Sequence, residues 1–275
     1  MDTIGIAVIS VTVIGIVCAV VLVIASTVMA VKVDERAAAI RACLPGANCG
    51  ACGFSGCDGY AAALTAGDVG INLCTPGGGD VAKQIGDILG TGPDTGVASR
   101  TAVVHCMGGL EIRRDKMDYE GIKSCSAAKL MFGGQAACTF GCIGYGDCAA
   151  ICPSGAICIE NGLARIDTRR CSGCGLCAKN CPNGVISIED ESIAVAVLCR
   201  NTEKGAQVKD KCGKGCIGCM KCVKECPDGA ITVTDFLAGI DYSKCSGCGK
   251  CAEVCVKGCI DLRREVSPPV TAEQL

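Results

Sequence analysis

The longest unbroken run of apolar positions lies at the start of the chain. Residues 3–31 hold 29 positions without a charged side chain, most of them Val, Ile or Ala. At about 1.5 Å of rise per residue, a helix of this length exceeds the ~30 Å hydrocarbon core of a bilayer. Lys32, Arg36 and Arg41 follow the run and no Lys or Arg precedes it, so the positive-inside rule places the remainder in the cytoplasm. We predict a transmembrane helix over 1–31, in a single pass through the cytoplasmic (inner) membrane with the N-terminus outside.

Beyond this run, apolar stretches are short and come in pairs. Residues 155–167 and 229–241 each hold a short apolar stretch, a turn and a second short stretch, a pattern that predicts a small β-hairpin. The two segments are 74 positions apart, and the same shift superposes several cysteines, which indicates a duplication. Short segments rich in Ala, Lys and Glu between the cysteines predict single helical turns. The predicted fold class is therefore α+β.

Composition excludes an ordinary apolar core. The 275 residues include 28 Cys and 38 Gly but no Trp, four Phe and four Tyr, so disulfides or metal must organise much of the chain. Cysteines in short Cys-x2-Cys runs on the cytoplasmic side are typical of metal ligands rather than disulfides. A net charge of −2 argues against a nucleic-acid partner.

The first cysteine motif predicts one 4Fe-4S cluster. Its spacing is Cys49-x2-Cys52-x4-Cys57-x16-Cys74, with glycines between the cysteines. Glycine lets the backbone pass close to a bulky inorganic core, and the exposed amides can donate to its sulfurs. Zinc could use the same four thiolates by ligand count alone and remains the alternative here.

Four further runs match the two-cluster ferredoxin pattern, in which the fourth Cys of each run ligates the other cluster. The runs beginning at Cys171 and Cys216 have the spacing Cys-x2-Cys-x2-Cys-x3-Cys-Pro. The crossed ligand sets predicted for clusters 2 to 5 are Cys138, Cys142, Cys148 and Cys181; Cys152, Cys171, Cys174 and Cys177; Cys216, Cys219, Cys222 and Cys255; and Cys226, Cys245, Cys248 and Cys251.

Cys138 enters cluster 2 because Tyr145 stands where the repeat has Cys219. Cys212, which superposes on Cys138, is then a remnant or an alternative ligand. Cysteines outside the five sets are interpreted as packing residues, His105 as structural. A possible extra set, the basis for a sixth cluster, is Cys106, Cys125, Cys199 and Cys212, against the alternative that these are ordinary buried thiols.

The order of parts resembles the B subunit of the Rnf ion-translocating ferredoxin:NAD oxidoreductase complex. The most specific stretches are 48–57 and 141–148. The resemblance implies that the chain takes electrons from soluble ferredoxin and relays them to other Rnf subunits. It also implies NAD+ reduction coupled to Na+ or H+ movement. Two features depart from the family pattern: Val256 replaces the expected proline, and a second ferredoxin module is present.

The predicted domains are the anchor over 1–31, a 4Fe-4S domain over 32–90, a connecting segment over 91–130, ferredoxin-like modules over 131–188 and 189–263, and a flexible tail over 264–275. Two rival functions stay open: a zinc-binding structural or regulatory protein, and an electron-feeding subunit of another membrane oxidoreductase.

Overall fold

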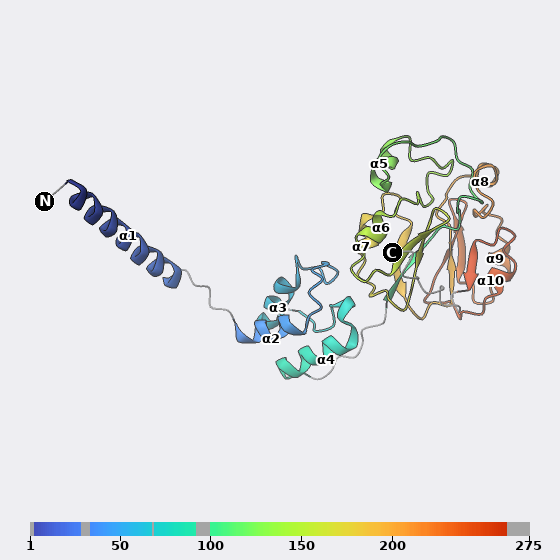
Figure 1. The fold of residues 1–275 in the computed structure, drawn as a ribbon. Coiled ribbons are helices and arrows are strands. Elements are labelled where there is room, and N and C mark those ends of the chain that lie inside the picture. Colours follow the sequence, from blue (N-terminus) through green and yellow to red (C-terminus); the bar gives the residue numbers. More distant parts are fainter. Residues whose placement is uncertain (1–2, 29–33, 68, 92–99, 263–275) are drawn as a thin grey trace.

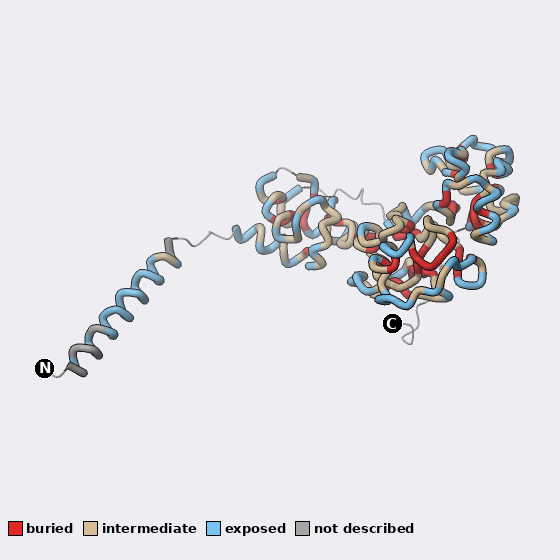
Figure 2. The backbone as a smooth tube through the Cα atoms, turned by 90° about the horizontal axis from the view of Figure 1, so that it is seen from above, coloured by how far each residue is buried: buried red, intermediate tan, exposed pale blue. Residues whose placement is uncertain are grey.

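The N-terminal helix stands apart from the rest of the chain. The computed structural model describes residues 3–28, 34–67, 69–91 and 100–262. Helix α1 (Thr3–Val28) has 26 residues, and its described apolar side chains are exposed (Figures 1 and 2). In the described part of the chain, no helix has the length and apolar character needed to cross a membrane. The helix is confirmed, but the transmembrane span predicted over 1–31 is not. Residues 29–31 and the predicted tail over 264–275 lie outside the described residues.

A small helical unit surrounds the first cysteine motif. It comprises α2 (Glu35–Cys43), α3 (Cys57–Ala66), a 3-10 turn (Thr75–Gly77) and α4 (Gly78–Leu89). Helices α3 and α4 end at Gly67 and Gly90, whose left-handed φ angles of 81° and 69° a residue without a Cβ adopts easily. The buried core of this unit includes Ile40, Tyr60, Leu64 and Ile85.

Residues 100–262 contain two copies of one arrangement of helical turns and strands. The first copy comprises α6 (Asp147–Ala150), β2 (Ile157–Glu160), β3 (Leu163–Ile166), α7 (Leu176–Asn180) and β4 (Ile186–Asp190). The second comprises α9 (Lys221–Glu225), β6 (Ile231–Thr234), β7 (Leu237–Ile240), α10 (Lys250–Glu253) and β8 (Ile260–Leu262). Strands β2 and β3 pair antiparallel, as do β6 and β7, in the same register. Both predicted hairpins and the 74-residue repeat are confirmed.

Each copy gains one more strand from the chain that precedes it. Strand β1 (Arg100–Val104) pairs antiparallel with β4, and β5 (Val195–Val197) pairs antiparallel with β8. β-branched residues suit these strands because one face packs on a buried core. The stretch predicted as a connecting segment over 91–130 thus contributes a strand to the first copy.

The segments after β1 and β5 are equivalent but differ in length. His105 N donates to Val185 O at 2.7 Å, and Leu198 N makes the same 2.7 Å bond to Cys259 O. The two acceptors are 74 positions apart, whereas the two donors are 93 apart. The first copy therefore has 19 additional residues between its outer strand and its first cysteine run. These include α5 (Cys125–Leu130), while the shorter segment of the second copy holds α8 (Gly205–Lys211).

Buried residues gather in the strands of both copies. Figure 2 colours buried residues red, and many of them lie in the part of the chain remote from α1. The core of the first copy includes Ile157, Leu163, Ile166, Val185 and Ile186, and that of the second includes Val195, Val197, Ile231 and Ile260. Cysteines from the motifs line both cores. The cores therefore fix the positions of the thiols.

Candidate metal centres

The first motif brings its four cysteines together in the helical unit. Cys57 begins α3, and its backbone N–H donates to Asn48 Oδ1 at 2.9 Å. The pKa of Cys74 is raised, chiefly by burial and further by nearby thiols, which are those of Cys57, Cys49 and Cys52. These four residues, the Cys49 set, are the ones predicted for cluster 1.

The crossed set predicted for cluster 3 lies beside α7. A hollow of about 310 Å³, open solvent included, is lined by Cys152, Cys171, Cys174 and Cys177, here called the Cys152 set. Burial, and after it the other three thiols, raises the pKa of Cys177 to about 12. Ala102 N of β1 donates to Cys171 Sγ at 3.4 Å, and Ala156 N donates to Cys152 Sγ at 3.4 Å. Such bonds stabilise thiolate charge and raise the potential of a bound cluster.

The second copy brings together one of its predicted sets and three residues of the other. Cys216, Cys219, Cys222 and Cys255, the Cys216 set, line a hollow of about 350 Å³. Burial raises the pKa of Cys222 to about 11, with further contributions from the other members of this set. The Cys226 set is Cys226, Cys245, Cys248 and Cys251. Burial is the main cause of the raised pKa of Cys251, and the nearby thiols of Cys245 and Cys248 raise it further. Cys226 packs against the core that contains Cys251.

The ligand set predicted for cluster 2 needs a correction. Cys142, Cys148 and Cys181 line a hollow of about 360 Å³, but the fourth cysteine there is Cys125, not Cys138. The pKa of Cys148 is raised to about 12 by burial and then by these same three neighbours, Cys142, Cys125 and Cys181. We call Cys125, Cys142, Cys148 and Cys181 the Cys125 set.

Asp147 holds Cys125 in this position. Its carboxylate accepts hydrogen bonds from Cys125 N at 2.8 Å, Ser124 Oγ at 2.9 Å, and Ser126 N and Oγ at 3.0 Å. Burial alone would raise the pKa of Asp147, but these hydrogen bonds together lower it. The first turn of α5 is therefore tied to α6, which carries Cys148.

Sequence proximity misled the prediction about Cys138. Tyr145 does occupy the position of Cys219, as the repeat shows, and its ring lies 5.7 Å from that of Tyr119 in the longer segment. That segment folds back over the first cysteine run and supplies the missing thiol from α5. Cys125, although more distant in sequence than Cys138, is therefore the residue that lies beside Cys142, Cys148 and Cys181. The spacing of the cysteines within the run does not predict this contact.

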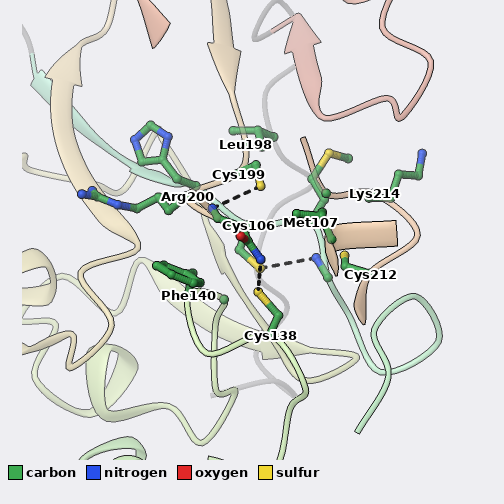
Figure 3. Close-up of a pocket in the computed structure, with 15 residues that line it drawn as sticks. Cys106, Met107, Cys138, Phe140, Leu198, Cys199, Arg200, Cys212 and Lys214 are labelled. Atoms are coloured by element: carbon green, nitrogen blue, oxygen red, sulfur yellow. Dashed lines mark hydrogen bonds between the residues drawn. The ribbon is translucent and has the colours of Figure 1, made fainter. Parts of the chain in front are cut away.

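Cys138 instead lines a further hollow with three of the cysteines considered for an extra set. Cys106, Cys138, Cys199 and Cys212, the Cys106 set, line about 320 Å³ of space between the two copies. Figure 3 shows the four labelled cysteines extending from separate stretches of chain into this pocket. Burial raises the pKa of both Cys106 and Cys199 to about 11. The extra set considered from the sequence contained three of these residues but had Cys125 in place of Cys138.

Cys259 is buried at the position that Ala156, Val185 and Ala230 take in the other runs, all of them buried too. It also lines the hollow of the Cys216 set, with its Sγ 3.6 Å from Cys255 Sγ. Cys158 is buried on β2, and Cys43 Sγ donates to Ala39 O at 3.4 Å. His105 Nδ1 bonds with Val197 O at 2.7 Å and Nε2 with Ser187 Oγ at 2.6 Å. Across the described residues, no three His, Cys, Asp or Glu side chains are grouped to hold a single metal ion.

Family models match three stretches of the chain. One described as "Putative Fe-S cluster" matches residues 44–76, which contain the Cys49 set. Two described as "4Fe-4S dicluster domain" match residues 170–231 and 215–259. The motifs therefore belong to iron–sulfur domains of the 4Fe-4S type.

Named relatives cover most of the chain. The B subunit of the Na(+)-translocating ferredoxin:NAD(+) oxidoreductase complex of Acetobacterium woodii is 38% identical over 84% of this chain and 69% of its own length. The B subunit of an ion-translocating oxidoreductase complex of Methanosarcina acetivorans is 42% identical, over 90% and 94% of the two chains. The B subunit of the proton-translocating ferredoxin:NAD(+) oxidoreductase complex of Clostridium ljungdahlii is 40% identical, over 89% and 87%. This chain therefore belongs to the family of B subunits of ion-translocating oxidoreductase complexes.

Proposed function

We propose that this chain accepts electrons from reduced ferredoxin and relays them to partner subunits, which reduce NAD+ and move Na+ or H+ across a membrane. The observation that carries the proposal is the gathering of cysteines into groups, three of which surround hollows of about 310 to 360 Å³ with at least four cysteines each. The names of the relatives supply the donor, the acceptor and the ion coupling. Electron transfer needs no nucleophile or base, so the chain's role is to hold and tune redox groups.

Five of the cysteine groups fit 4Fe-4S clusters. Cubane clusters are held by four Cys thiolates, and each of these groups provides four. Backbone N–H groups are aimed at ligand sulfurs, as Ala230 N is at Cys226 Sγ, 3.3 Å away. When bound, the clusters supply one-electron chemistry. The proposed ligand groups are the Cys49, Cys125, Cys152, Cys216 and Cys226 sets.

Electrons enter at the second copy, and the Cys49 set delivers them to the partner subunits. Cys248 of the second copy is exposed, whereas the equivalent Cys174 of the first copy is buried. An exposed ligand brings a cluster near the surface where a soluble donor docks. Replacing Cys248 by Ser should therefore slow oxidation of reduced ferredoxin by the intact complex. Unchanged ferredoxin oxidation after loss of both clusters of the second copy would contradict this direction.

Helix α1 attaches the chain to the membrane, with the cysteine-rich part in the cytoplasm. Support comes from large apolar side chains that lie at the surface of α1, among them Val17 and Val21, which are 55% and 58% exposed. Replacing Val17 and Val21 by Asp in the full chain should release it from membranes, because each charge opposes burial in lipid. Replacing both by Leu is the matched control. Equal membrane retention of both variants would disprove the attachment.

The decisive experiment for the function is metal and sulfide analysis of the full chain. The chain is purified anaerobically, and iron, acid-labile sulfide and zinc are measured beside EPR spectra after dithionite reduction. Iron and sulfide in equal amounts, with rapid oxidation by the partner subunits, support the proposal. Zinc without sulfide would favour a structural or regulatory protein, and reduction by another donor but not by ferredoxin would favour a different membrane oxidoreductase.

A further inference from the structure

We propose that the Cys106 set binds a further 4Fe-4S cluster, which links the two ferredoxin-like copies. The inference rests on the proposed function in one respect, namely that groups of four thiols in this chain hold cubane clusters. It concerns a different place in the fold, between the two copies rather than inside either. None of the three matched family models covers the whole set, since they lie at residues 44–76, 170–231 and 215–259.

The four cysteines are two pairs of equivalent residues. Cys138 and Cys212 are 74 positions apart, and each stands four residues before the first cysteine that both copies share. Cys106 and Cys199 are 93 positions apart, the separation of the two outer strands that precede them. Each copy therefore contributes one thiol after its outer strand and one before its cysteine run. A chance grouping of surplus thiols would not follow the symmetry of the fold.

The sulfurs of these pairs accept the same hydrogen bonds in both copies. Cys106 Sγ accepts from Gly108 N at 3.4 Å and from Cys142 N at 3.3 Å. Cys199 Sγ accepts from Asn201 N at 3.5 Å and from Cys216 N at 3.3 Å. Two backbone donors on one sulfur stabilise a thiolate, the form that ligates iron.

Glycines bring the sulfurs close together. A Cβ at Gly108 would lie 3.4 Å from Cys212 Sγ and 3.7 Å from Cys106 Sγ, so these two sulfurs are within about 7 Å of one another. A Cβ at Gly141 would lie 3.4 Å from Cys106 Sγ and 3.8 Å from Cys138 Sγ, which sets a similar limit. The absence of side chains at both glycines leaves room for an inorganic core. The resulting hollow, about 320 Å³, lies within the range of 310 to 360 Å³ found for three other sets.

Asn201 completes the site from the second copy. Its side chain is buried, and its Nδ2 donates to Cys138 Sγ at 3.4 Å, while its backbone N–H donates to Cys199 Sγ. One residue thus holds a thiol from each copy. Nδ2 also donates to Glu203 at 3.0 Å, which fixes the amide orientation.

The position of the site explains what a cluster there would do. One of the two donors to Cys106 is Cys142, and one of the two donors to Cys199 is Cys216. These donors belong to the Cys125 and Cys216 sets, one in each copy. The site therefore stands one hydrogen bond away from a ligand residue of each copy. A cluster in it would take up one electron from the second copy and give one to the first, with no proton or group transferred.

Iron counting separates this site from its alternatives. We expect about 24 irons and as many sulfides per full chain, against about 20 if only five sets are loaded. The double variant Cys106→Ser with Cys138→Ser should lose about four irons, because both residues belong to one cluster. The double variant Cys106→Ser with Cys125→Ser should lose about eight, because it damages two. Cys43→Ser, outside every set, is the control and should lose none.

Each outcome decides the proposal. A wild-type count near 20 overturns the further cluster while the proposed function stands, and zinc without sulfide overturns both. The opposite result would be a loss of eight irons in the Cys106→Ser, Cys138→Ser variant and of four in the Cys106→Ser, Cys125→Ser variant. It would restore the assignment predicted from the sequence and refute the one proposed here. If a double variant fails to fold, the wild-type count still decides. EPR should also lose spin coupling between the two copies in the Cys106→Ser, Cys138→Ser variant but not in the control.

Discussion

Replacement of Asp147 by Ala tests whether Cys125 is a cluster ligand held in place by the longer segment. The carboxylate accepts four hydrogen bonds, two from the backbone and two from serines at the start of α5. Loss of an acceptor costs about 1–3 kcal/mol when donors are left unsatisfied. Asp147 is partly exposed, so water can replace some of the hydrogen bonds that the donors lose. We therefore expect a cost in the lower half of this range, about 1–2 kcal/mol.

The consequence is local opening of α5 rather than global unfolding, because the hydrogen bonds tie one short helix to the first copy. A change of about 1–2 kcal/mol raises the opened fraction by about 5- to 30-fold. Hydrogen exchange at the α5 amides should accelerate within this range. Iron loss from the Cys125 set to a chelator should accelerate with it, while the other sets keep their iron.

The pH dependence gives an independent check. The pKa of Asp147 in the folded chain lies below its ordinary value of 3.8, so its contribution is fully present above that value and is lost as the pH falls through the folded pKa. The difference between wild type and Asp147→Ala should therefore be constant from about pH 5 to 8. Replacement of the exposed Asp118 by Ala is the control. Exchange and iron retention equal to wild type in Asp147→Ala would refute the reasoning.

Three further outcomes are expected. Arg113, whose side chain is 3% exposed, donates from Nη1 to the Cys142 carbonyl at 3.0 Å; replacing it by Gln should lower the midpoint potential of the nearest cluster in an EPR-monitored titration, whereas Lys should largely preserve it. Gly173→Ala would place a Cβ 2.4 Å from a backbone oxygen of β1 and should destabilise the chain by about 1–3 kcal/mol. The measurement is denaturant-induced loss of the cluster absorbance. Gly184→Ala, where the new Cβ meets nothing within 4 Å, is the control and should destabilise the chain less. Cys259→Ala should keep the full iron content, because alanine fills the equivalent position in two other runs; loss of about four irons would make Cys259 a ligand.

The sequence alone determined the features that depend on local spacing. The cysteine runs, the hairpins β2–β3 and β6–β7 and the 74-residue repeat follow from patterns within a few residues, because turns and short strands are set by neighbouring side chains. The grouping of the Cys49, Cys152, Cys216 and Cys226 sets also follows from spacing, once the crossed pattern of two-cluster ferredoxins is applied. The family, too, was recognisable from the order of these motifs.

Only the tertiary structure decided which thiols meet across long separations. Cys125 reaches its set through hydrogen bonds to Asp147, 22 positions away, and Cys106 and Cys142 meet over 36 positions. The 74-residue shift aligned Cys125 with Cys199, whereas the outer strands β1 and β5 align Cys106 with Cys199. The segment between the outer strand and the first cysteine run is 19 residues longer in the first copy. The 74-residue shift therefore does not superpose the outer strands, although they pair in the same way in both copies. Strand pairing and packing, which bring distant segments together, therefore determined the cysteine groups that spacing could not.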